Sequence, residues 1–89
     1  MVNKHEKLLR KILGGGKTGE IDFEDLCDLL VYLGFERRVK GSHDIFDMPG
    51  IHEQPNLQAI GKAAKPFQVR QVRKTIIKYK LAPKDEHDA

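Results

Sequence analysis

The sequence predicts an α+β domain in which two helices pack on one face of a three-stranded antiparallel sheet, with an extra helix at the N-terminus. Two observations indicate this fold class. Apolar residues recur at helical spacing before Gly34 and again after Pro66, and between these points they alternate with polar residues. The chain has 89 residues, of which 39% are hydrophobic, so it fits one domain with a modest core. We expect residues 1–16 to form the N-terminal helix and a glycine hinge, 17–81 the main domain, and 82–89 a disordered tail.

Three segments have the apolar spacing of amphipathic helices. The first covers residues 4–13 and ends at three glycines, 14–16. The second covers residues 22–33, where Asp22 is suited to be the N-cap and Gly34 favours termination. The third begins at Pro66, which lacks the N–H that a first helical turn leaves unpaired, and Pro83 is expected to stop it. Its predicted buried stripe consists of Val69, Val72, Ile76 and Tyr79.

Alternation with a period of two predicts three strands between the second and third helices. The first strand runs from Phe35 to Lys40, and Gly41 with Ser42 forms the turn that follows. The second runs from His43 to Met48, so that His43 and Asp44 face opposite sides of the sheet. A weaker third strand ends near residues 56–58, and Pro55 argues for an edge position because proline cannot donate to a neighbouring strand.

The charges are segregated along the chain, although the net charge is only +3. Every charged side chain between Gly19 and Gly34 is acidic, and every one between Ile60 and Leu81 is basic. A basic C-terminal helix predicts a surface for a polyanion, most commonly a phosphate backbone, although such a stripe also serves solubility alone. The cations expected to contact RNA are Arg38, Lys40, Lys62, Lys65, Arg70, Arg73, Lys74 and Lys78.

His43 is the candidate for chemistry, as general base or acid in RNA cleavage. Histidine suits both proton steps because its unperturbed pKa is about 6.5. Lys40 and Arg38 are close in sequence and are candidates to stabilise the phosphate. The alternative is a half-buried sheet histidine with no proton role. His52 is expected on a hairpin rim as a surface residue, and no histidine pair has the spacing of a zinc motif.

The stretch from Ile21 to Leu81 resembles the HicA family of mRNA interferase toxins. The resemblance rests on the acidic helix ending in Leu33-Gly34-Phe35, on Lys40-Gly41-Ser42-His43 followed by Ile45-Phe46, and on the basic C-terminal helix. It implies a fold like a double-stranded RNA-binding domain and metal-independent endoribonuclease activity on mRNA without a cofactor. It also implies His43 as the catalytic residue, Gly41 and Ser42 as the turn that presents it, and a cognate HicB-type antitoxin that covers His43. The chain departs from many members, which have a Pro-His pair near the end of the third strand.

Two other functions stay open: a non-catalytic RNA-binding module, and a protein-interaction subunit whose basic helix meets an acidic partner. No apolar run approaches the roughly 20 residues that a membrane span needs, and the N-terminus lacks the apolar region of a signal peptide. The single cysteine, Cys27, fits a reducing compartment, so we expect a cytoplasmic protein.

Overall fold

The computed structural model describes residues 3–14 and 19–81. Its elements follow one another as α1 (Lys4–Leu13), α2 (Phe23–Tyr32), β1 (Glu36–Lys40), β2 (His43–Asp47), β3 (Asn56–Gln58) and α3 (Pro66–Tyr79). The predicted α+β class and the order of elements are confirmed. The predicted tail at 82–89 and most of the predicted hinge lie outside the described residues.

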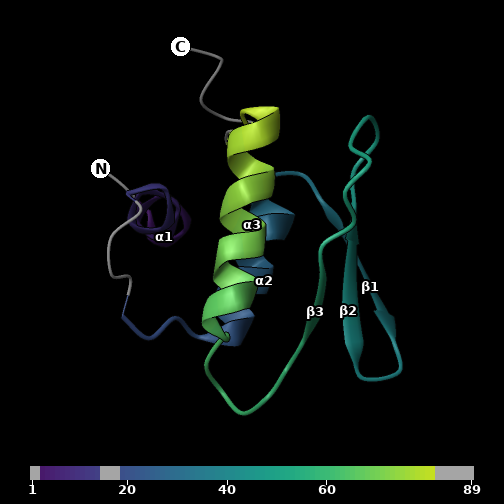
Figure 1. Ribbon diagram of the computed structural model, residues 1–89, viewed down its shortest axis with the longest axis horizontal. Coiled ribbons are helices and arrows are strands. Elements are labelled where there is room, and N and C mark those ends of the chain that lie inside the picture. Colours follow the sequence, from purple (N-terminus) through teal and green to yellow (C-terminus); the bar gives the residue numbers. More distant parts are fainter. Residues whose placement is uncertain (1–2, 15–18, 82–89) are drawn as a thin grey trace.

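The three strands form one antiparallel sheet in the order β1-β2-β3, so β2 is central. Figure 1 shows α2 and α3 on one side of this sheet, with α3 between α1 and the strands. The helix-facing side carries the buried side chains of Asp44, Phe46 and Leu57. Because side chains alternate along a strand, His43 and Asn56 lie on the opposite side, where both are exposed.

A single hydrophobic core joins the three helices to the sheet. Helix α1 takes part in it, since Ile12 is fully buried and Leu9 is nearly so. Burial of these two side chains against α2 and α3 gives α1 a fixed place in the fold. The rest of the core comes from the other elements and consists of Ile21, Phe23, Leu26, Cys27, Leu29, Leu30, Leu33, Phe35, Phe46, Leu57, Val69, Val72 and Ile76.

The ends of the helices follow local chemistry. Asp22 caps α2 as predicted, because its side chain accepts a hydrogen bond from the Asp25 N–H at 3.1 Å. Helix α3 ends at Tyr79 and not at Pro83: Lys80 adopts a left-handed conformation, with φ of 51°. The N–H of Leu81 then donates to the Ile76 carbonyl at 3.0 Å, and the Leu81 side chain packs against the core.

Tyr32 packs against the core, whereas Tyr79, predicted as part of the buried stripe of α3, is only half-buried; each hydroxyl has a polar partner. Tyr32 accepts a hydrogen bond from the Asn3 side chain at 3.1 Å, and its ring stacks on that of His5. Tyr79 donates to the carboxylate of Glu53.

None of the helices in the described ranges combines the length and the apolar character that a membrane span requires.

Candidate functional site

The turn between β1 and β2 sets the position of His43. Gly41 and Ser42 join the strands, and Lys40 lies directly opposite His43 in the antiparallel register. Gly41 has a φ of 63°, a conformation that favours glycine at the first position of a two-residue hairpin turn. Paired residues in an antiparallel ladder share a face of the sheet. Lys40 and His43 therefore lie together on the outer face, at one end of the sheet.

The third strand supplies two polar side chains to the same end of this face. Gln58 is the register partner of His43, and its amide Nε2 donates to the Ser42 hydroxyl at 3.2 Å. Asn56 lies diagonally across from His43, with its Oδ1 2.8 Å from the imidazole Nδ1. Neither contact was predicted from the sequence. The alternation of side chains along β3 places Asn56 and Gln58 on the same face, but it does not identify their neighbours on β2 until the register of the two strands is known.

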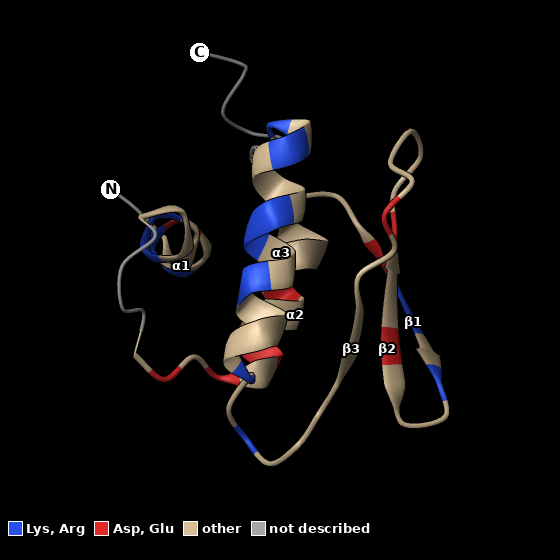
Figure 2. Ribbon diagram, viewed as in Figure 1, with Lys and Arg blue, Asp and Glu red and all other residues tan. Residues whose placement is uncertain are grey.

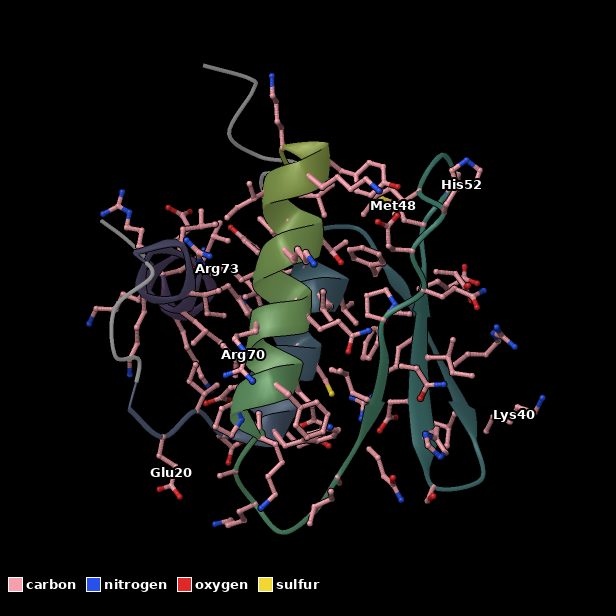
Figure 3. The ribbon with its side chains drawn as sticks, in the orientation of Figure 1. Glu20, Lys40, Met48, His52, Arg70 and Arg73 are labelled. Carbon is pink, nitrogen blue, oxygen red and sulfur yellow. The ribbon has the colours of Figure 1, made fainter. Side chains whose placement is uncertain are left out.

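The two cations expected near His43 have different surroundings. Arg38 forms an ion pair with Asp47, with its Nε 3.1 Å from Oδ2. The side chain of Lys40 forms no hydrogen bond or ion pair with any residue in the described ranges, and Figure 3 shows it extending away from the helices. Of these two side chains, Lys40 is the one available to an anion bound beside His43.

Behind this face, a polar cluster holds β1 and β2 against α2. Asp44 is buried, as expected for a residue on the opposite side from His43, and the Nε of Arg37 donates to it at 3.0 Å. The other guanidinium nitrogens of Arg37 donate to the two carboxylate oxygens of Glu24 at 3.1 and 3.2 Å. These hydrogen bonds raise the pKa of Arg37, and those to Glu24 have the largest effect, so the guanidinium stays charged.

Helix α3 is connected to the site through β3. The buried side chain of Gln68 donates from Nε2 to the Gln58 carbonyl at 2.9 Å and accepts from the Lys65 N–H at 3.0 Å. Together these bonds tie the first turn of α3 to the short strand that carries Asn56 and Gln58. Lys65 and Lys62 are exposed on the segment before the helix, and the Lys62 carbonyl accepts from the Phe23 N–H at 2.7 Å.

The cations of α3 lie on the helical layer, whereas His43 lies on the far side of the sheet. Figure 2 shows the positions of the Lys and Arg residues along α3, and Figure 3 shows the side chains of Arg70 and Arg73 on the side of the helix toward α1. Arg70 and Lys74 are exposed and line an open depression with Gln71 and Arg73. Lys78 is instead paired with Glu53 at 2.7 Å. The predicted RNA-contacting residues therefore fall into two groups, one on β1 near His43 and one on α3 and the segment just before it.

The described residues place no second histidine beside His43. His52 is exposed in the segment between β2 and β3, and Figure 3 shows it at the end of the hairpin opposite to Lys40. His5 belongs to α1, where it stacks on Tyr32; His87 lies outside the described residues. Nor does any group of three or more His, Cys, Asp or Glu side chains in the described ranges gather as metal ligands do.

Comparison of the chain with models of known families, with curated proteins and with solved structures gives no match.

Proposed function

We propose that this protein is a HicA-type toxin: an endoribonuclease that cleaves mRNA in the cytoplasm without a metal ion and is held inactive by a HicB-type antitoxin. The observation that carries the proposal is an exposed histidine, His43, with the cation of Lys40 directly opposite it across the Gly41–Ser42 turn. The order α2-β1-β2-β3-α3, with both helices on one face of the sheet, supports a fold like that of double-stranded RNA-binding domains.

In the proposed reaction, His43 removes the proton of a ribose 2′-hydroxyl, and the 2′ oxygen attacks the adjacent phosphorus. The bond from phosphorus to the 5′ oxygen breaks, which leaves a 2′,3′-cyclic phosphate on one fragment and a 5′-hydroxyl on the other. The ammonium group of Lys40 stabilises the negative charge that builds on the phosphate. Because this face is exposed, water supplies the proton to the leaving oxygen.

Incubating the purified protein with RNA in the presence of EDTA tests this function. Wild type is expected to cleave RNA and leave 2′,3′-cyclic phosphate ends. His43→Ala should lower the rate by about 10²–10⁴-fold, the usual contribution of a general base. His52→Ala is the matched control, since it removes an exposed histidine at the other end of the hairpin and should keep full activity.

Circular dichroism should show the same fold for all three proteins. Equal activity, or equal inactivity, of wild type and His43→Ala over a range of salt and pH would contradict the proposal. In cells, expression of the wild-type chain alone should arrest growth, and co-expression of an antitoxin encoded in the neighbouring reading frame should relieve the arrest.

The separation of the two cation groups favours a second candidate, a non-catalytic RNA-binding module. Arg70 and Lys74 are exposed on the helical layer, where they are able to bind a phosphate backbone without His43. RNA binding without cleavage, unchanged in His43→Ala and lost when Arg70 and Lys74 are neutralised, would favour this function. Tight binding to an acidic protein with no RNA affinity would instead favour an interaction subunit.

A further inference from the structure

The imidazole of His43 has one side-chain hydrogen-bond partner within the described ranges, and that partner determines which ring nitrogen carries the proton. Its Nδ1 lies 2.8 Å from Oδ1 of Asn56. An amide oxygen accepts hydrogen bonds and cannot donate them, so the proton between the two atoms belongs to Nδ1. In the neutral ring the other nitrogen, Nε2, then carries the free lone pair.

The backbone holds Asn56 in this position from two sides. On one side, the antiparallel register places Asn56 opposite Ile45, and the Phe46 N–H donates to the Pro55 carbonyl at 2.9 Å. On the other side, the Gln58 carbonyl accepts the 2.9 Å hydrogen bond from Gln68, which is only 2% exposed. Because the backbone of Asn56 is held in this way, its side chain loses little further conformational freedom when it orients the imidazole of His43.

The position of the ring proton matters because only the unprotonated nitrogen of a neutral imidazole can act as a base. Free histidine prefers the tautomer with its proton on Nε2, in which that nitrogen cannot accept a proton. A partner oxygen on Nδ1 reverses this preference and makes Nε2 the base. Asparagine achieves this without adding a negative charge next to the phosphate, whereas a carboxylate at the same position would repel the substrate.

We propose that Asn56 is a positioning residue, which holds His43 in the Nδ1–H tautomer so that Nε2 is the atom that takes the 2′-hydroxyl proton. The catalytic part of this inference rests on the proposed function. The tautomer itself does not, because it is a property of the free protein and is measurable without RNA.

Two-bond ¹H–¹⁵N spectra of the uniformly ¹⁵N-labelled full chain, recorded in mildly alkaline solution, distinguish protonated from unprotonated ring nitrogens. His43→Ala identifies the resonances of His43. For wild type we expect a protonated Nδ1 and an unprotonated Nε2. Asn56→Ala should shift the ring toward the Nε2–H form, and Asn56→Asp, which keeps an accepting oxygen, should retain the Nδ1–H form.

The matched control is Gln54→Ala. Gln54 lies just before β3, the strand that carries Asn56. Its side-chain amide contacts Asp47 and not His43, so its loss should leave the His43 tautomer unchanged. An Nε2–H ring in wild type, or the same tautomer in wild type and Asn56→Ala, would overturn the inference.

Kinetics then test the positioning role. Asn56→Ala should lower kcat by about tenfold to a hundredfold, the loss typical of partners that orient metal-bound histidines, with little change in KM. Asn56→Asp should recover part of this loss and move the acidic limb of the pH–rate profile upward, because a carboxylate favours the protonated ring.

The two proposals fail in different ways. RNA cleavage by a wild-type protein whose His43 carries the Nε2–H tautomer overturns the positioning role and leaves the nuclease function standing. A wild-type protein that has the Nδ1–H tautomer, loses it in Asn56→Ala and shows no cleavage supports the role of Asn56 in setting the tautomer and overturns the nuclease function. Loss of the Nδ1–H tautomer in Asn56→Ala with unchanged kcat overturns the catalytic part of the inference alone.

Discussion

Arg37 and Asp44 form an ion pair on the inner face of the sheet, with Nε and Oδ1 separated by 3.0 Å, directly behind the strand segment that presents His43. The side chain of Asp44 is 12% exposed and that of Arg37 is 27% exposed. A carboxylate removed from water to this extent depends on its cation, because an unpaired buried charge is strongly destabilising.

Arg37→Leu is therefore expected to lower the free energy of unfolding by about 2–3 kcal/mol, slightly below the roughly 3–5 kcal/mol that breaking a fully buried pair costs. Arg38→Leu is the matched control, because Arg38 and Asp47 form a pair whose side chains are 55% and 34% exposed. Its loss should cost about 0–1 kcal/mol. Urea denaturation followed by circular dichroism measures both values, and equal losses would show that Asp44 does not depend on Arg37.

The register of β1 and β2 also separates the two cations near His43. Lys40 faces His43 across the turn, whereas Arg38 is held by Asp47. Under the proposed function, Lys40→Ala should lower kcat/KM by about tenfold, less than the roughly 10²–10³ seen for donors in a water-excluded site. Arg38→Ala should have a smaller effect, and Lys40→Arg should keep most of the activity. Steady-state cleavage of a short RNA measures these changes, and a larger loss in Arg38→Ala than in Lys40→Ala would reverse the assignment.

Periodicity in the sequence was sufficient to predict the helices, the strands and the alternation of side chains along β1 and β2. The opposite placement of His43 and Asp44 follows from alternation, and the opposition of Lys40 and His43 follows from a turn of two residues. Both features depend on residues that are close together in the chain, so they can be predicted from the sequence.

The contacts that sequence reasoning did not predict join parts of the chain that no short turn relates. Asn56 meets His43 only because the segment between β2 and β3, which has no standard turn length, sets their register. The same segment places Glu53 against Lys78, 25 positions away, so Lys78 has a carboxylate partner that charge counting did not predict. Charge counting predicted a basic helix surface, but charge alone does not show that the sheet lies between α3 and the face that carries His43.

The free cations of α3 give a prediction about salt. Each phosphate contact on single-stranded RNA contributes about 0.7 to the slope of log affinity against log salt concentration. Replacing both Arg70 and Lys74 by Gln should therefore reduce the slope by about 1.4. Lys78→Gln should leave it unchanged, because Glu53 already neutralises Lys78. Fluorescence anisotropy measures the slopes in a His43→Ala background, which keeps the RNA intact, and equal slopes in all variants would exclude α3 from the RNA contact.

Cys27 gives a prediction about alkaline pH. The thiol is fully buried, and burial raises its pKa from 9.0 to about 12 because the interior disfavours the thiolate. Between these values the unfolded chain releases the thiol proton and the folded chain keeps it, so the free energy of unfolding falls as the pH rises through this window.

Cys27→Ala removes this titration and should make the fall between pH 9 and pH 12 shallower, by at most about 1.4 kcal/mol per pH unit. The variant loses some stability at neutral pH, because a smaller side chain leaves a cavity, but this loss is a constant offset. Urea denaturation at a series of pH values separates the two effects, since the lysines titrate alike in both proteins. Parallel stability curves for wild type and Cys27→Ala above pH 9 would show that the thiol ionises as readily in the folded chain as in the unfolded one.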